Sequence, residues 1–300
     1  MIVAEGLAKT YRGGAGVEDL SFTVRPGVVT GFLGPNGAGK STTIRLMLGL
    51  TRGRGRTTFG GRTYAQVPGP LRTVGVLTDA AAVHPARPAA AHLRMVAAGG
   101  GLPAGRVREV LATVGLESVA KRPAGRFSLG MKQRLGLATA LLGDPEYLIL
   151  DEPATGLDPE GVRWIRDLLR RLAGEGRTIL ASSHLLAEMS LLAEDLIVIG
   201  AGRLVSAGPL DEFVRRHARA DVVVRVDQPS VLLVALARDG LRVRQDAAEL
   251  VVETADTERV AAVAGRAGVG VRELFVRQSG LEDAFLAATA AAVRHRGELP

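Results

Sequence analysis

The sequence contains no cysteine, and only 4% of its residues are aromatic. Without cysteine the chain has no disulfide bonds, zinc–thiolate sites or thiol chemistry. With so few aromatic side chains, a basic surface interleaved with stacking rings for nucleic acid is not expected. Acidic residues interrupt the most apolar stretches, so none reaches the roughly 18 to 20 apolar residues of a membrane span. The N-terminus also lacks the charged-then-apolar pattern of a signal sequence.

Lysine is scarce too. The chain has 38 basic residues, of which four are lysine: Lys9, Lys40, Lys121 and Lys132. A net charge of +7 has two interpretations, an anionic partner or arginine spread over solvated faces. We favour the second, and expect no nucleic-acid partner. The densest basic run, with Arg52, Arg54 and Arg56 among glycines, is predicted to be a surface loop.

One of the four lysines lies in the stretch LGPNGAGKST, residues 33–42, which fits the pattern G-x-x-x-x-G-K-[ST]. Glycines let backbone N–H groups surround an anion, and the helix predicted to start near Lys40 adds its positive dipole end. Lysine is a compact charge that reaches the β- and γ-phosphates, while the Ser41 hydroxyl suits Mg²⁺. The residues predicted to bind a nucleotide here are Gly34, Pro35, Asn36, Gly37, Ala38, Gly39, Lys40, Ser41 and Thr42.

Strand and helix patterns alternate around this motif. Apolar strands are predicted at 28–34, 73–78, 147–153, 178–184 and 195–200, and helices at 41–50, within 85–143 and at 161–176. Alternation of this kind predicts a parallel α/β sheet. The composition shifts near residue 210, and we predict a second, small α+β domain of βαββαβ order over residues 220–300.

An acidic pair ends one of these strands, in the stretch LILDEP. The carboxyl ends of strands in α/β sheets hold ligands. Asp151 is therefore predicted to bind Mg²⁺, and Glu152 to polarise the attacking water as a general base. The alternative, an acidic cap or turn, is less favoured because the glycine loop lies upstream.

The stretch FSLGMKQRLGLA, residues 127–138, resembles the signature motif of ATP-binding cassette (ABC) ATPases. The resemblance runs from Tyr11 to about Gly208, with the motifs in the family's order. It implies an α/β fold of the P-loop NTPase (RecA-like) type over residues 1–210, with a helical subdomain at about 85–143. It also implies ATPase activity with ATP and Mg²⁺ as cofactors.

The resemblance assigns further residues to the nucleotide. Tyr11 matches the aromatic that stacks on adenine. Ser128 and Gly130 match signature residues that contact the γ-phosphate of a nucleotide bound to the opposite subunit. Asp158 matches an aspartate at the dimer seam, and His184 matches the switch histidine that touches the γ-phosphate.

The chain departs from the family pattern at three places. The signature reads Ser-Leu-Gly-Met, with Leu129 and Met131 replacing the usual glycine and glutamine. Asp79 stands where the family's Q-loop has glutamine. Its carboxylate would still face Mg²⁺, but with a charge and a shorter reach. The third departure is the C-terminal domain.

The function implied by the resemblance is that of a motor subunit of a bacterial exporter of an antibiotic, drug or peptide. It would work as a head-to-tail dimer, of two copies or with a paralogue. A separate membrane permease would dock on the helical subdomain, so the chain is expected in the cytoplasm, peripheral on the inner face of the cell membrane. Two alternatives stay open, a soluble ABC ATPase acting on ribosomes or nucleic acid and a nucleotide binder that does not hydrolyse.

Overall fold

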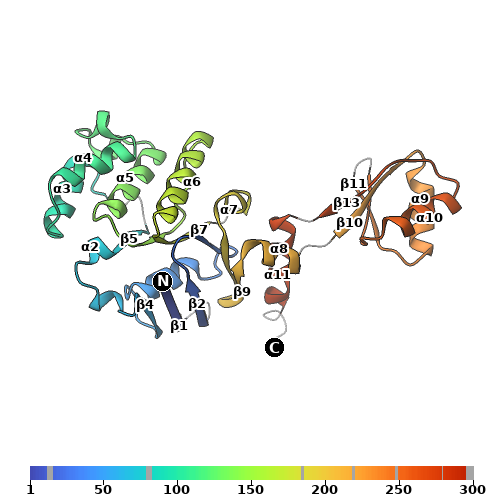
Figure 1. Ribbon diagram of the computed structural model, residues 1–300, viewed down its shortest axis with the longest axis horizontal. Helices are drawn as coiled ribbons and strands as arrows, with labels where there is room; N and C mark the ends of the chain where they lie inside the picture. The colour runs from blue at the N-terminus through green and yellow to red at the C-terminus, as the bar shows by residue number, and fades with distance from the viewer. Residues whose placement is uncertain are drawn as a thin grey trace. The chain divides into compact units, whose positions relative to one another are not determined.

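The structure is a computed structural model that describes residues 1–11, 16–78, 83–183, 186–217, 220–246, 249–278 and 280–294. Its contacts divide the chain into two units, residues 1–210 with 289–300, and residues 211–288 (Figure 1).

A six-stranded sheet forms the centre of the first unit, in the order β5-β6-β7-β3-β8-β9. Its strands are β3 (Val29–Leu33), β5 (Val74–Leu77), β6 (Tyr147–Leu150), β7 (Thr178–Ser183), β8 (Asp195–Gly200) and β9 (Arg203–Pro209). The first five strands in that order are parallel, and only β9 runs antiparallel to its neighbour. Every residue of β3, β6, β7 and β8 is buried, as expected for parallel strands covered on both faces. The predicted parallel α/β sheet is confirmed.

Helices surround this sheet and form a separate helical region. They are α1 (Lys40–Met47), α2 (Pro70–Thr73), α3 (Ala89–Gly99), α4 (Gly105–Thr113), α5 (Leu129–Leu141), α6 (Pro159–Gly174) and α7 (Leu186–Leu192). Short 3₁₀ helices lie at Tyr64–Gln66, Glu117–Val119 and Ala124–Arg126. Helices α3, α4 and α5 pack on one another and lie together in Figure 1, where the sequence predicts a helical segment.

A second, antiparallel sheet in this unit has the order β2-β1-β4 and is absent from the sequence predictions. Its strands are β1 (Ile2–Thr10), β2 (Gly16–Val24) and β4 (Arg54–Phe59). The prediction of a surface loop was wrong for Arg54 and Arg56, which lie in β4. Both are exposed, and Arg56 pairs with Glu5 of β1 at 2.8 Å, so solvent-facing arginines concealed the strand pattern.

The second unit contains a four-stranded antiparallel sheet in the order β11-β12-β10-β13. Its elements are β10 (Ala220–Val226), α9 (Pro229–Arg238), β11 (Val243–Asp246), β12 (Glu249–Val252), α10 (Thr257–Arg266) and β13 (Val271–Gln278). The predicted βαββαβ order is confirmed. Helices α9 and α10 lie on one side of the sheet (Figure 1), over a core that includes Val222, Leu236 and Val252. Two further helices are α8 (Leu210–His217) and α11 (Leu281–Arg294).

The helices show no membrane-spanning character. Within the described ranges, none combines the length and the apolar composition that crossing a bilayer requires.

Candidate functional site

The glycine loop follows β3, which lies between β7 and β8 in the sheet. The buried strand therefore places residues 34–39 at the carboxyl edge of the sheet, directly before α1. Gly39 has a φ of 106°, a left-handed conformation that favours glycine. A Cβ at Gly39 would also lie 2.8 Å from the Val17 side chain. Glycine is thus required here, and the first turn of α1 directs backbone N–H groups and its positive dipole end toward the loop.

Lys40, the first residue of α1, is held inside this loop. Only 8% of the residue is exposed, and Nζ donates to the Gly34 carbonyl at 2.6 Å and to the Pro35 carbonyl at 3.4 Å. Burial lowers the pKa of Lys40, an effect that the negative charges of Glu152 and Asp151 partly offset. The charged ammonium therefore bears a desolvation cost that an anion in the loop would reduce.

The acidic pair follows β6, and the neighbouring strand β7 fixes its position. Ser182 of β7 donates its hydroxyl to Asp151 Oδ1 at 2.6 Å and accepts the Glu152 backbone N–H at 2.9 Å. Gln133 of α5 donates to the Glu152 carbonyl at 2.9 Å. Glu152 has a φ of 51°, the left-handed region that non-glycine residues rarely adopt. Strain of this kind persists where the surroundings hold it and is concentrated at functional sites.

Ser182→Ala tests the importance of this contact. The substitution leaves one oxygen of Asp151 and the Glu152 amide without their partner, in a site where Ser182 is 0% exposed. We expect a loss of stability of about 1 to 3 kcal/mol, together with a fall in ATP turnover of about tenfold, seen by thermal denaturation and a phosphate-release assay. Ser190→Ala, on the exposed face of α7, is the control and should change neither quantity.

The loop and Glu152 of the acidic pair share one cavity of about 490 Å³, whereas Asp151 does not line it. Its lining residues are Pro35, Asn36, Gly37, Gly39, Lys40, Ser41, Thr42, Glu152 and Thr155. A nucleotide-sized space thus joins seven of the nine residues of the predicted loop to the predicted general base. Ala38 is instead 4% exposed and belongs to the hydrophobic core.

Comparison with known proteins places this arrangement in a family. The sequence profile of the family described as "ABC transporter" matches residues 17–155. An uncharacterized ABC transporter ATP-binding protein of Bacillus subtilis, YhcH, is 35% identical over 95% of this chain and 94% of its own length. The chain belongs to the ABC transporter ATP-binding proteins. It is an ABC ATPase, and residues 220–282 match a separate "domain of unknown function" (DUF8746).

Other relatives of this ABC ATPase have named activities. The bacitracin transport ATP-binding protein BcrA of Bacillus licheniformis is 40% identical over 73% of each chain. The Nod factor export ATP-binding protein I of Ralstonia nicotianae is 35% identical over 98% of this chain and 95% of its own. A solved ATP-binding subunit of an ABC transporter is 29% identical with a TM-score of 0.66, covering 72% of this chain and 92% of that one.

The stretch predicted to be the signature motif lies at the start of α5. Ser128 caps the helix, its hydroxyl accepting the Met131 N–H at 3.3 Å. A Cβ on Gly130 would lie 3.1 Å from the Gly156 carbonyl, and one on Gly156 would lie 2.3 Å from Leu129 Cδ2. The signature therefore packs against the segment that follows the acidic pair. Neither Ser128 nor Gly130 lines the cavity between the loop and Glu152.

Two further predicted residues lie at the surface. Asp158 is the N-cap of α6, where its Oδ1 accepts the Gly161 N–H at 2.8 Å. Tyr11 is 44% exposed, with the Lys9 ammonium 5.3 Å from its ring centroid, and does not line the cavity.

Asp79 and His184 lie outside the described residues. Three residues that contact the site are absent from the sequence predictions: Ser182, Gln133 and Thr155. For Ser182 a signal exists, because it stands at the carboxyl end of a predicted strand.

Proposed function

We propose that this ABC ATPase is the motor subunit of a bacterial exporter, in which ATP binding and hydrolysis in a dimer drive transport through a separate membrane permease. The observation that carries the proposal is the single cavity in which the loop around Lys40 faces Glu152. Relatives are named for bacitracin transport, lantibiotic transport and Nod factor export, and the last of these names supports the direction.

The residues of the cavity fit a nucleotide with Mg²⁺. Lys40 would contact the β- and γ-phosphates by leaving its two backbone carbonyls, which relieves the desolvation of its ammonium. Ser41 is exposed at the cavity, where its hydroxyl would bind Mg²⁺. Asp151, with one oxygen fixed by Ser182, would supply a carboxylate for the same ion. Bound Mg²⁺ neutralises negative charge on the phosphates.

Glu152 is the group that would accept a proton from the attacking water. The carboxylate lines the cavity opposite the loop, while its backbone is fixed by Ser182 on one side and Gln133 on the other. The Glu152 backbone is strained but held by two hydrogen bonds, which fixes the position of the residue. Such positioning suits a general base, because the rate enhancement that a base gives depends on its geometry.

The second half of the nucleotide site would come from a partner subunit. Ser128 and Gly130 lie away from their own cavity, and Leu129 beside them is 57% exposed, so this turn is open to contact. We infer that they contact a nucleotide bound to the opposite subunit, with Asp158 at the seam. Tyr11 and His184 complete the proposed site, stacking on adenine and contacting the γ-phosphate.

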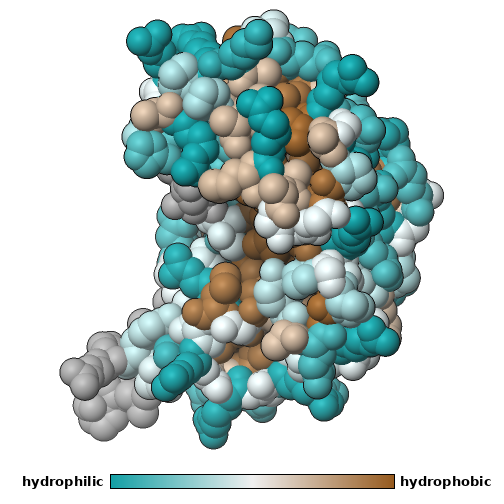
Figure 2. All heavy atoms as spheres, turned by 90° about the vertical axis from the view of Figure 1, so that its left-hand side faces the viewer, coloured by the Kyte–Doolittle hydropathy of each residue, from teal (hydrophilic) through white to brown (hydrophobic). Residues whose placement is uncertain are grey.

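The nucleotide-binding domain, proposed as residues 1–210, also offers a surface for the permease. Figure 2 shows an apolar band between hydrophilic side chains on the face of the first unit that bears α3 and α4. Met95 of α3 is 49% exposed. The helical subdomain at 85–143 is the proposed docking site, which places the chain at the inner face of the cell membrane. Residues 220–300 are proposed as an accessory domain.

The two alternatives receive less support. The longest helix in the described part of the chain is α6, with 16 residues, so a long coiled-coil arm for ribosomes is not seen there. A protein that binds a nucleotide without hydrolysing it would not need a general base such as Glu152 in the cavity.

The test compares wild type with Glu152→Gln in the native host. Tagged protein from detergent-solubilised membranes should retain a polytopic membrane protein in both forms, after washing with high salt. Cells carrying Glu152→Gln should become more susceptible to the exported compound, with bacitracin and a lantibiotic as first candidates. Glu258→Gln, an exposed change in the C-terminal domain and outside the proposed docking site, should leave export intact. Recovery of the chain with ribosomes, or with no membrane protein, would refute the proposal.

A further inference from the structure

Helix α9 of the second unit exposes apolar side chains on its outer face. Leu232 and Leu236 point into the core with 0% exposure, whereas Val231 and Val234 are 44% and 47% exposed. A surface helix normally carries polar residues on its outer face. Valine is also a weaker helix former than alanine or leucine. Neither core packing nor helix propensity therefore accounts for the two valines.

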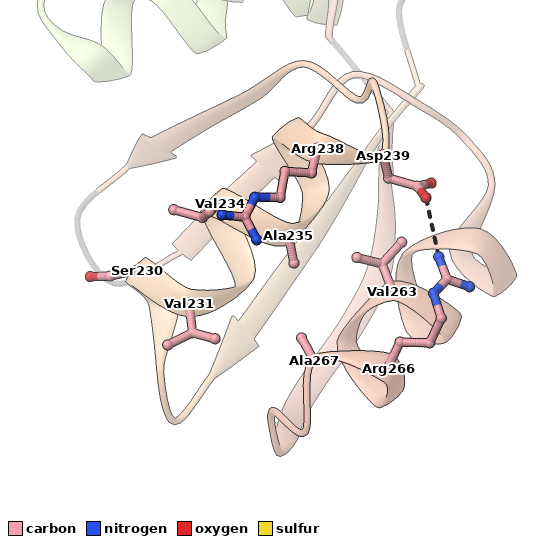
Figure 3. A pocket seen from close by; sticks show the side chains of 9 residues that line it. All are labelled: Ser230, Val231, Val234, Ala235, Arg238, Asp239, Val263, Arg266 and Ala267. Atoms are coloured by element: carbon pink, nitrogen blue, oxygen red, sulfur yellow. Dashed lines mark hydrogen bonds and ion pairs between the residues drawn. The ribbon is translucent and has the colours of Figure 1, made fainter.

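The two valines form one side of a groove between α9 and α10 (Figure 3). Its floor and far side come from Ala235, Val263 and Ala267. The groove has a volume of about 700 Å³, within the range of about 300 to 1,000 Å³ that small-molecule sites occupy. It lies wholly within the domain of unknown function, and none of its lining residues belongs to the nucleotide cavity.

One end of the groove carries a surplus of positive charge. Asp239 pairs with both Arg259 and Arg266 at 3.1 Å. Arg238 also lines the groove, so three arginines lie in this part of the domain with one carboxylate. The Arg238 guanidinium makes no ion pair or hydrogen bond with any of the described residues. Figure 3 shows it near Val234 and Ala235, while Val231 and Ala267 line the opposite, apolar end.

We propose that this groove binds a small amphipathic anion, with its apolar body along the two valines and its anionic head on Arg238. The stripe from Ser230 to Arg238 spans about 12 Å of helix, which suits two fused rings or a chain of roughly ten carbons. A guanidinium is planar and binds carboxylate, phosphate or sulfonate groups through paired N–H donors. The ligand site is separate from the ATP site.

A small ligand fits the groove better than a protein partner. Stable protein interfaces use about 20 to 30 residues on each side, and only nine residues line this groove. The charge is also gathered at one end, as a ligand with one anionic head requires. A second copy of the chain would instead need a broader apolar face.

The test uses two fluorescent probes that differ in one group. Anilinonaphthalene sulfonate has an apolar body, two fused rings with a phenylamino group, and a sulfonate; phenylnaphthylamine is the same body without the sulfonate. Both are titrated into the full chain in the presence of ATP and Mg²⁺, so that the nucleotide cavity is filled. One saturable site per chain, tighter for the sulfonate, is the expected result.

Variants separate the two parts of the groove. Arg238→Glu should weaken the sulfonate probe at least about tenfold and leave the uncharged probe nearly unchanged. Val234→Asp should abolish binding of both. Two controls change the same residue types elsewhere in this domain: Arg242→Glu, whose side chain is 86% exposed, and Val271→Asp, on a valine that is 42% exposed. Both controls should bind the two probes as wild type does, and circular dichroism establishes that all variants fold.

Three outcomes would overturn the proposal. The first is sulfonate binding that Val234→Asp leaves intact, and the second is a loss in Arg238→Glu no larger than in Arg242→Glu. The third is a concentration-dependent dimer without nucleotide that Val234→Asp dissolves, which would make the valines a protein contact.

Discussion

Lys40→Met is expected to weaken ATP binding about ten- to hundredfold and to leave the nucleotide-free protein at least as stable as wild type. The first effect follows because charge-assisted contacts contribute about 1.5 to 3 kcal/mol each. The second follows from the burial of Lys40, which lowers its pKa and therefore disfavours its charged form. Methionine retains the apolar stem and removes the ammonium, so the loop keeps its packing and loses its contact with phosphate.

Thermal denaturation measures both effects on one sample. A ligand at one hundred times its Kd stabilises the wild type by about 2.7 kcal/mol. In a unit of this size that is a rise in Tm of roughly 5 to 10 °C. With Kd raised a hundredfold, the same ATP concentration stabilises the variant by only about 0.4 kcal/mol.

Two further variants isolate the reason for lysine at this position. Lys121→Met, on an exposed lysine of the helical region, should keep the full rise in Tm with ATP. Lys40→Arg keeps the charge but needs space for a planar fork where Nζ now lies 2.6 Å from the Gly34 carbonyl, so it should not restore binding. A Lys40→Met protein with the full ATP-dependent rise would show that the loop binds nucleotide without its lysine.

The parts of the site that the sequence predicts are those formed by residues close together in the chain. A glycine loop between a buried strand and a helix, and two acids at a strand end, are each contiguous in the chain. Their physical requirements are therefore visible without the fold. Lys40 and Glu152 line one cavity because both follow parallel strands, whose carboxyl ends meet at one edge.

The contacts that the sequence does not predict depend on strand order. Ser182 binds both acids because β7 lies between β6 and β3, and nothing in the local sequence gives that order. Gln133 reaches the site from α5 by tertiary packing alone. The β2-β1-β4 sheet was missed because its strands, such as β4 with its exposed arginines, lack the continuous apolar runs of the buried strands.

Glu152→Gln is expected to reduce ATP hydrolysis by about a hundred- to ten-thousandfold, the usual contribution of a positioned general base, while ATP binding stays within about threefold of wild type. Glutamine has nearly the same shape, and the two bonds that fix this residue, from Ser182 and Gln133, involve only its backbone. The change therefore removes proton acceptance and preserves position. Single-turnover hydrolysis measures the first effect, and the ATP-dependent rise in Tm measures the second.

The same variant tests the proposed dimer, because blocked hydrolysis should trap two subunits around ATP. Light scattering should show a shift from monomer to dimer only with ATP and Mg²⁺, and Ser128→Arg on the same background should prevent it.

Glu152→Gly separates backbone strain from chemistry. Glycine relieves a φ of 51° that costs about 1 to 2 kcal/mol, so the Tm of Glu152→Gly should exceed that of Glu152→Gln, while both variants fail to hydrolyse ATP. Turnover in Glu152→Gln above about a tenth of wild type would assign the base to another residue, since removal of the true base costs at least about a hundredfold.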